Sequence, residues 1–199
     1  MKLVLASTSA ARRTMLTAAD VSFEAVAPYI DEAELKRALL QEGASPRSLA
    51  DALAEAKAIK LSRRFGAGFL VLGADQILED ADGFTLDKPE TIEKATEQLI
   101  SLRGGCHKLI SAAVIAENGI PVWRAIDAAQ LWVRNFSDAF LTDYIAREGE
   151  SVLGCVGSYR LEALGAQLFS KIEGDHFTIL GLPLLAVLDY LRVRGVIAS

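Results

Sequence analysis

The chain has 199 residues, of which 51% are apolar, and its 21 Lys and Arg against 26 Asp and Glu give a net charge of −5. This length and composition predict a globular protein with one core, or with one core and a cleft between two lobes, and exclude a disordered chain. The acidic balance argues against a protein that binds duplex nucleic acid, which needs a basic stripe, but it leaves room for a small anionic substrate.

Strands and helices are predicted to alternate along the chain, which is the pattern of an α/β domain. In the first half, the expected elements are a strand over 3–6, a helix through Arg12, Met15 and Leu16, a strand over 23–27, helices over 32–41 and 48–65, and a buried central strand over 69–78. In the second half, they are a helix over 92–102, strands over 107–116 and 122–134, a helix from the Ser137 cap to Arg147, and a helix over 183–194.

Two dipeptides predict hairpin turns, Asp82-Gly83 and Asn118-Gly119. A glycine-rich stretch over 154–181 carries no clear periodicity. Because no repeat and no long linker interrupts the pattern, residues 1–199 are expected to form a single domain.

Features of membrane and secreted proteins are not expected. Charged residues interrupt every long apolar run, and the apolar stretch 3–6 is too short for a signal peptide. Cys106 and Cys155 are too few for a disulfide framework or a zinc site, so they are interpreted as reduced thiols. These observations favour a cytoplasmic protein that contacts neither membrane nor nucleic acid.

Lys57 lies on the apolar stripe of a predicted helix. Ser45 caps this helix and Pro46 takes its first position. On the helical repeat, Lys57 falls within the stripe made by Ala50, Leu53, Ala54 and Leu61. An ammonium turned toward a core either extends back to solvent, the more frequent outcome for a lone lysine, or meets an anion there.

Asp75 lies within the apolar run 69–78, where a carboxylate is costly unless it is paired or bound to a metal. The carboxyl end of a central α/β strand is also where open sheets bind their ligands. The alternative is that the strand ends at Ala74 and that Asp75 starts a turn. The functional interpretation is favoured.

The segment after the first strand places Ser7, Thr8 and Ser9 before a helix start, followed by Arg12 and Arg13. Free backbone N–H groups and the helix dipole favour an anion there, and arginines bind phosphate bidentately. A capping cluster followed by two solvated arginines is the simpler alternative.

Two further charged positions complete the candidate set. One of Asp31 and Glu32 is interpreted as a magnesium or manganese ligand opposite Asp75, although a helix cap with a first-turn acid fits equally well. Lys88 is held by Pro89 and is either presented to a ligand or a solvated loop lysine. His107 and His176 are isolated in the sequence and are interpreted as structural.

Cations, two carboxylates and a hydroxyl-rich helix start suit a polyphosphate ester with a divalent metal. The chain has neither the G-x-x-x-x-G-K-[ST] motif nor G-x-G-x-x-G. It is therefore predicted to be neither a P-loop protein nor a dinucleotide-binding one.

From Leu3 to about Gly195 the chain resembles the Maf (septum-formation inhibitor) family of nucleoside triphosphate pyrophosphatases. The resemblance is carried by an ordered set of motifs: Leu-Ala-Ser-Thr-Ser-x-x-Arg-Arg (5–13), Asp31-Glu32, Ala56-Lys57-Ala58, Gly73-Ala74-Asp75-Gln76, Lys88-Pro89, Gly157-Ser158-Tyr159, Glu173-Gly174 and Ile179-Leu180-Gly181-Leu182-Pro183-Leu184. It implies a Maf/ITPase-like α/β fold, an elongated mixed sheet flanked by helices with two lobes around a deep cleft. It also implies a homodimer, a divalent cation (Mg²⁺ or Mn²⁺), and hydrolysis of a nucleoside triphosphate to monophosphate and pyrophosphate.

The residues and the resemblance together assign three groups of site residues. The catalytic set is Asp75, Lys57 and Lys88, with Asp75 as either general base or metal ligand. The substrate-binding set is Ser7, Ser9, Arg12, Arg13, Gln76 and Glu162. The metal ligands are Glu32 and Asp75.

Gln76 and Glu162 resemble the branch of the family that acts on 7-methyl-GTP, whereas the branch acting on dTTP and UTP carries threonine and glutamine there. A carboxylate accepts both guanine N–H groups, although Glu162 is equally well explained as a surface acid. Ala10 and Ala11 depart from the bulkier residues usual before the arginines. The alternatives to this enzyme are a non-catalytic nucleotide-binding regulator of cell division and a phosphatase that removes the terminal phosphate; a house-cleaning or division-arrest role is the expectation for the enzyme.

Overall fold

The structure, a computed structural model, describes residues 1–198. Within them, seven strands form one mixed sheet in the order β2-β1-β3-β5-β6-β7, with β4 paired to β3. The strands are β1 (Lys2–Ala6), β2 (Phe23–Ala25), β3 (Phe69–Glu79), β4 (Thr85–Leu86), β5 (Cys106–Glu117), β6 (Ile120–Val133) and β7 (Phe169–Glu173). The helices are α1 (Ala10–Ala18), α2 (Glu32–Gln41), α3 (Pro46–Phe65), α4 (Ile92–Leu102), α5 (Asp138–Glu148), α6 (His176–Ile179) and α7 (Leu184–Val193). The predicted α/β class is confirmed.

The chain divides into two compact units. The first unit comprises residues 1–76, 110–127 and 175–199, and the second comprises 77–109 and 128–174. Strands β3, β5 and β6 each contribute residues to both units. The two units are described separately below.

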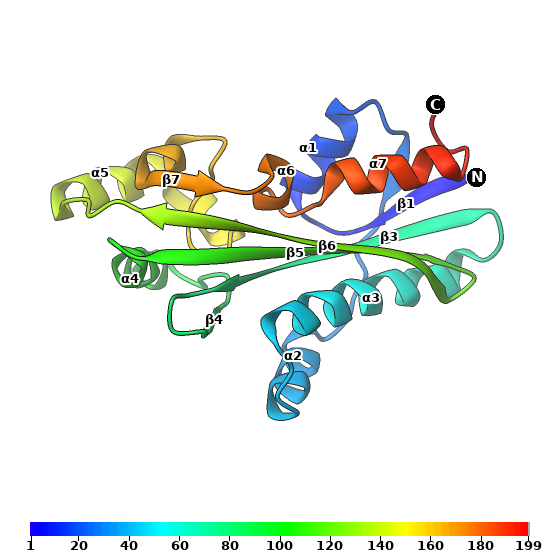
Figure 1. The fold of residues 1–199 in the computed structure, drawn as a ribbon, viewed down its shortest axis with the longest axis horizontal. Coiled ribbons are helices and arrows are strands. Elements are labelled where there is room, and N and C mark those ends of the chain that lie inside the picture. The colour runs from blue at the N-terminus through cyan, green and yellow to red at the C-terminus, as the bar shows by residue number, and fades with distance from the viewer. Residues whose placement is uncertain (199) are drawn as a thin grey trace. The chain divides into compact units, whose positions relative to one another are not determined.

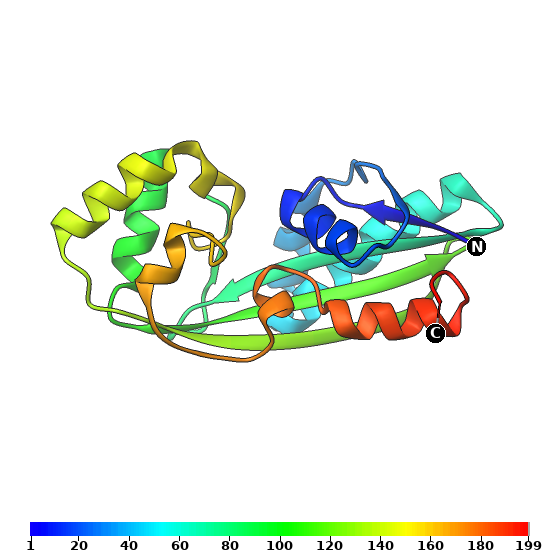
Figure 2. The same cartoon turned by 90° about the horizontal axis from the view of Figure 1, so that it is seen from above.

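In the first unit, β1 pairs in parallel with β2 and β3, with Leu3 opposite Leu70 and Ala6 opposite Gly73. Helix α3 covers one face of this sheet, and α1 and α7 cover the other (Figures 1 and 2). Side chains alternate between the two faces along β1, as the period of a strand requires. Leu3 and Leu5 therefore face α1 and α7, whereas Val4 packs toward α3 with Leu61.

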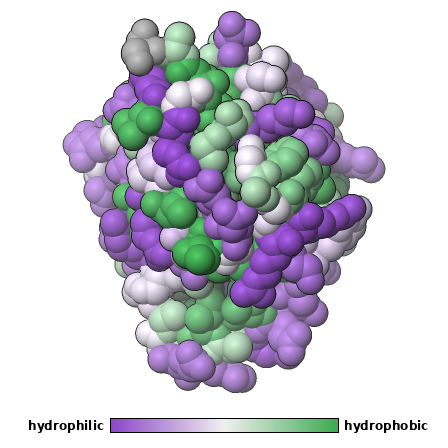
Figure 3. All heavy atoms as spheres, turned by 90° about the vertical axis from the view of Figure 1, so that its right-hand side faces the viewer, coloured by the Kyte–Doolittle hydropathy of each residue, from purple (hydrophilic) through white to green (hydrophobic). Residues whose placement is uncertain are grey.

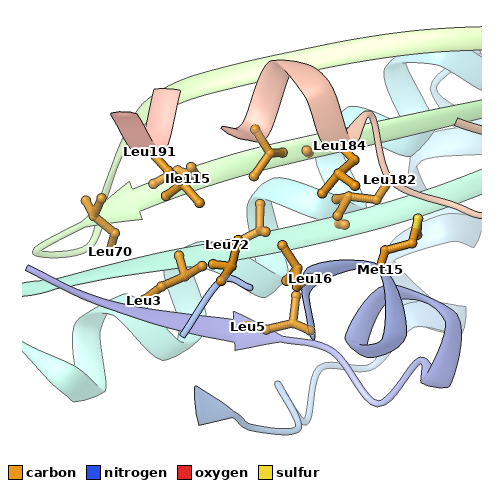
Figure 4. Close-up of a cluster of buried hydrophobic side chains, with 14 residues drawn as sticks. Leu3, Leu5, Met15, Leu16, Leu70, Leu72, Ile115, Leu182, Leu184 and Leu191 are labelled. Atoms are coloured by element: carbon orange, nitrogen blue, oxygen red, sulfur yellow. The ribbon is translucent and has the colours of Figure 1, made fainter. Parts of the chain in front are cut away.

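The larger of these cores lies under α1 and α7. Figure 4 shows Met15 and Leu16 of α1, together with Leu184 and Leu191 of α7, pointing toward the strands. Ile115 of β5 belongs to the same cluster. This core anchors the start of α1, which is one of the segments the sequence marks for function.

Local signals predicted several helix and turn boundaries correctly. Ser9, Ser45 and Ser137 each cap a helix by accepting a hydrogen bond from a backbone N–H three residues on. Asn118 and Gly119 have φ values of 52° and 79°, as a tight two-residue turn between β5 and β6 requires. Both predictions, the caps and the hairpin turn, are confirmed.

In the second unit, the end of β3 pairs antiparallel with β4, and β6 pairs antiparallel with β7. The Asp82-Gly83 turn therefore forms as predicted, with Gly83 at φ 86°. Tyr144 of α5 is fully buried, and its hydroxyl donates to the carbonyl of Ser158. Two short 3-10 segments, Gly149–Gly154 and Leu164–Leu168, follow α5.

Some elements differ from the sequence-based expectation. Strand β7 and helix α6 lie in the glycine-rich stretch for which no element was predicted. Strand β2 ends at Ala25, two residues before the predicted end. Strand β3 continues to Glu79, so the alternative in which Asp75 starts a turn is wrong. Asp75 instead lies inside β3, two residues beyond the last pairing with β1 at Gly73.

The face on the side where Figure 1 marks the N-terminus mixes hydrophilic and hydrophobic side chains (Figure 3). Among the described residues, none of the helices combines the length and hydropathy that crossing a bilayer requires.

Candidate functional site

A buried ion cluster lies between α2, α3 and β3 in the first unit. Lys57 Nζ donates to Asp75 Oδ1 at 2.5 Å and lies 2.8 Å from Glu32 Oε2. Lys57 and Asp75 are 6% and 8% exposed, while Glu32 is exposed. The lysine thus meets an anion at the core and does not extend to solvent, and the two carboxylates share one ammonium.

Small residues let α3 lie this close to β3. A Cβ added to Gly73 would collide with the carbonyl oxygen of Ala54 and lie 2.6 Å from the nitrogen of Ala58. Ala54 and Ala58 flank Lys57 on the buried face of α3. The apolar stripe of the sequence therefore places the lysine directly over the strand that carries Asp75.

Arg12 is buried beside this cluster. Its Nε donates to the carbonyl of Gly181 at 2.8 Å, and its Nη1 donates to the carbonyl of Ala74 at 2.8 Å. Burial lowers the pKa of the Arg12 guanidinium below its usual value, and the negative charges of Asp75 and Glu32 oppose that shift. An arginine remains charged even so, which makes Arg12 a fixed buried cation.

The hydroxyl cluster before α1 is also ordered. Ser9 Oγ accepts from the Arg12 backbone N–H, and Ser7 Oγ accepts from the Ser9 N–H and from Arg12 Nη1. Each hydroxyl keeps its own O–H as a donor for an anion. Arg12 is buried, so the alternative of a solvated arginine is wrong for Arg12, whereas Arg13 is exposed.

Gln76 follows Asp75 on β3, and its side chain turns into the protein. Its Nε2 lies 3.1 Å from Ser111 Oγ and 2.9 Å from the carbonyl oxygen of Ile179. A third acceptor, the carbonyl of Thr178, lies at 3.1 Å. The amide nitrogen has two protons, and these partners occupy both.

Lys88 and Glu162 belong to the second unit and are exposed. The charges of both residues affect the pKa of the Cys155 thiol. Burial and the negative charge of Glu162 raise this pKa, and the positive charge of Lys88 lowers it. Lys88 and Glu162, 74 positions apart in the sequence, thus both lie close enough to Cys155 to change its pKa. Cys106 and Cys155 are free thiols, as expected.

Sequence reasoning missed the polar residues behind Gln76. Ser111 and Thr178 are fully buried, and Thr178 Oγ1 donates to Asp127 Oδ2 at 2.8 Å. Serine and threonine within a strand or a short helix carry no distinctive local signal, so no pattern in the sequence pointed to them. Asp31 proved to be the cap of α2, where its Oδ1 accepts from the Glu34 N–H.

The carboxylates of Asp75 and Glu32 are of the type that binds a divalent cation. Among the described residues, no group of three or more His, Cys, Asp or Glu side chains forms a metal cage. Mg²⁺, however, is usually held by one or two carboxylates and completed by water and substrate phosphates. Asp75 and Glu32 each use one oxygen toward Lys57, which leaves the other oxygen of each to act as a ligand.

The model of the family described as Maf-like protein matches residues 2–194. A nucleoside triphosphate pyrophosphatase of Caulobacter vibrioides is 53% identical over 191 residues, covering 96% of this chain and 94% of the relative. Relatives of the same name from Sphingopyxis alaskensis and Ruegeria pomeroyi are 48% and 49% identical over 195 residues, covering 98% of this chain and 98% and 97% of the relatives. This chain belongs to the Maf-like protein family.

Proposed function

We propose that this chain is a nucleoside triphosphate pyrophosphatase, which cleaves the bond between the α- and β-phosphates and releases a monophosphate and pyrophosphate. The observation that carries the proposal is the Asp75 carboxylate, held by Lys57 beside the Arg12 guanidinium inside the first unit. A buried carboxylate among fixed cations suits the hydrolysis of a polyphosphate. The names of the three relatives support the same reaction.

In this proposal, Asp75 orients the attacking water and, as general base, accepts its proton while the water oxygen bonds to the α-phosphorus. Lys57 and Arg12 offset the charge that develops on the leaving pyrophosphate, and the hydroxyls of Ser7 and Ser9 donate to a phosphate. A divalent cation, Mg²⁺ or Mn²⁺, would be held by Asp75 and Glu32 and would supply Lewis-acid stabilisation of the phosphate charge. In the alternative, Asp75 serves as ligand to this cation and not as base.

Four other residues keep the roles that the resemblance implies. Lys88 is proposed to be catalytic, Arg13 to assist in phosphate binding, and Glu162 to accept the N–H groups of a purine. Gln76 is proposed to contact the nucleobase through Oε1, because its Nε2 already donates within the protein. For the nucleobase we propose 7-methylguanine, and a panel that includes 7-methyl-GTP, dTTP and UTP tests this choice by comparing kcat/KM.

The reaction is tested by hydrolysis in ¹⁸O-labelled water. Attack at the α-phosphorus puts the label into the monophosphate and leaves pyrophosphate unlabelled. Label in the pyrophosphate shows attack at the β-phosphorus and contradicts the proposed mechanism. Release of single phosphate with a nucleoside diphosphate contradicts the proposed reaction and favours a phosphatase. Triphosphate binding without any product favours a non-catalytic regulator.

Asp75→Asn tests the residue that carries the proposal. We expect this variant to remain folded and to lose turnover, because an amide neither accepts the proton nor balances the charge of Lys57. The matched control is Asp189→Asn, an exposed aspartate whose partner is Arg192 on the same helix. An Asp75→Asn variant with nearly wild-type turnover would show that the assigned role is wrong.

The cellular setting is proposed on the resemblance alone. We propose a cytoplasmic homodimer that removes modified nucleotides or contributes to the arrest of cell division. Light scattering of the purified protein tests the dimer, and cell fractionation tests the compartment.

A further inference from the structure

Gln76, the residue after Asp75, is hydrogen-bonded to a turn in the C-terminal part of the chain. The turn, residues 178–181, comprises the last two residues of α6 and the two residues that follow it. Gln76 Nε2 lies 2.9 Å from the carbonyl oxygen of Ile179 and 3.1 Å from that of Thr178. Ser111 Oγ lies 3.1 Å from the same nitrogen and donates to the Thr178 carbonyl at 2.7 Å. Gln76 thus connects β3, β5 and the turn.

Arg12 links Ala74, the residue before Asp75, to the same turn. Arg12 Nη1 donates to the carbonyl of Ala74, and Arg12 Nε donates to the carbonyl of Gly181, each at 2.8 Å. Gly181 has φ 100°, a conformation that other residues rarely adopt, so this turn depends on glycine. The residues on both sides of Asp75 are therefore linked to residues 178–181, Ala74 through its carbonyl and Gln76 through its side chain.

Thr178 fixes the turn in its place. It is fully buried, and its Oγ1 donates to Asp127 Oδ2 at 2.8 Å. Its backbone N–H donates to Asp175 Oδ1 at 3.0 Å. Asp127 is exposed and lies on β6, so it can be changed without opening the core.

We infer that Ser111, Thr178 and Asp127 are positioning residues that hold the 178–181 turn and, through Gln76 and Arg12, keep Asp75 oriented for the reaction. The inference rests on the proposed function. None of the three needs to touch substrate. Their main effect is expected on kcat, because Asp75 acts in the chemical step, whereas the phosphate-binding hydroxyls of Ser7 and Ser9 lie before α1 and outside the turn.

The first test compares three single variants in the pyrophosphate-release assay. Thr178→Val keeps the shape of the side chain and removes the hydroxyl, and Asp127→Ala removes its acceptor. Each is expected to lower kcat roughly tenfold, since a misplacement of 1 Å can cost about a hundredfold, with KM changed little. Thr178→Ser restores the hydroxyl and is expected to recover most of kcat.

The double variant Asp127→Ala/Thr178→Val tests whether the two residues act through one bond. Residues that act through one interaction are not additive, so the double variant is expected to lose no more than either single variant. The matched control is Thr96→Val, which removes a hydroxyl that donates at 2.8 Å to the Ile92 carbonyl in α4. This control is expected to keep wild-type kcat.

Three outcomes would overturn the inference. They are wild-type kcat in Thr178→Val and Asp127→Ala, an equal loss in Thr178→Ser and Thr178→Val, and a rise in KM with kcat unchanged. A wild-type protein that releases no pyrophosphate from any triphosphate contradicts the proposed function instead. In that case amide hydrogen exchange decides, because Asp127→Ala should speed exchange in both the 178–182 and the 72–77 segments, and unchanged exchange in both overturns the inference on its own.

Discussion

Lys57 is the residue on which the buried cluster depends. It is the single cation hydrogen-bonded or ion-paired to both Asp75 and Glu32 among the contacts within the described chain. Lys57→Met keeps the aliphatic stem and removes the charge, which leaves a buried carboxylate without its partner. Breaking such a pair costs several kcal/mol, so we expect a loss of about 3 kcal/mol in the free energy of unfolding, measured by urea denaturation.

The same variant should respond differently to a divalent cation. With the ammonium gone, Asp75 and Glu32 are free to share Mg²⁺ or Mn²⁺, and a ligand of the folded state raises Tm. We therefore expect a larger rise of Tm with added cation in Lys57→Met than in the wild type. The control is Lys94→Met, which breaks an exposed pair with Glu97 and should change neither quantity measurably.

His107 makes the stability of the protein depend on pH. Its ring is buried, its Nε2 lies 2.7 Å from the Tyr159 hydroxyl, and burial lowers its pKa to about 4. Below about pH 6.5 the His107 ring binds a proton in the unfolded chain but stays neutral in the folded one. The free energy of unfolding therefore falls as the pH drops from about 6.5 to about 4. Over this window the loss attributable to His107 is about 3 kcal/mol.

This prediction is checked by urea denaturation across the window in the wild type and in His107→Gln. The difference between the two curves isolates the histidine from the carboxylates that also titrate at low pH. His176→Gln serves as control, because its ring is exposed in the folded protein. Parallel curves for wild type and His107→Gln would contradict the prediction.

At the scale of the elements, the approach of α3 to β3 determines the site. Gly73→Ala would drive a methyl group into the backbone of α3 at Ala54 and Ala58. We expect overpacking to destabilise the protein by about 1–3 kcal/mol and to lower kcat, because α3 carries Lys57. Denaturation midpoints and the pyrophosphate assay measure the two effects.

Gly154 provides the matched control for this substitution. It lies at the end of a 3-10 segment in the second unit, and a Cβ there meets nothing within 4 Å. Gly154→Ala should leave both stability and kcat close to wild type. A Gly73→Ala variant that matches this control would show that α3 can shift without consequence.

The elements with strong local signals could be predicted from the sequence. Serine caps, a proline at the first helical position and an Asn-Gly turn located α1, α3, α5 and the β5–β6 hairpin. Lys57 was recognisable as a candidate because it broke an apolar helical stripe. Asp75 was recognisable because it broke an apolar strand.

The remaining features depend on contacts between distant residues. Helix α6 has four residues and β7 has five, too few to show a period against the glycine-rich background. Two of the three partners of Gln76 are backbone carbonyls about 100 positions away, and every residue type has such a carbonyl. A pattern of side chains therefore cannot show that its amide nitrogen is already engaged.

At the scale of the whole molecule, the two units share strands. Strands β3, β5 and β6 each begin in one unit and end in the other, so unfolding of either unit would remove strands from its partner. We therefore expect one cooperative thermal transition, as for a single domain over residues 1–199. At about 0.7 kcal/mol per residue near 60 °C, its enthalpy should be about 140 kcal/mol.

Calorimetry distinguishes this behaviour from independent unfolding, because a two-state transition has equal calorimetric and van't Hoff enthalpies. Gly73→Ala lies in the first unit and His107→Gln in the second. If the shared strands couple the units, each variant moves the whole transition to lower temperature and leaves its single peak intact. If instead the units unfold independently, each variant shifts only part of the heat absorption, and a second peak separates. In that case only Gly73→Ala, in the first unit, lowers pyrophosphate release.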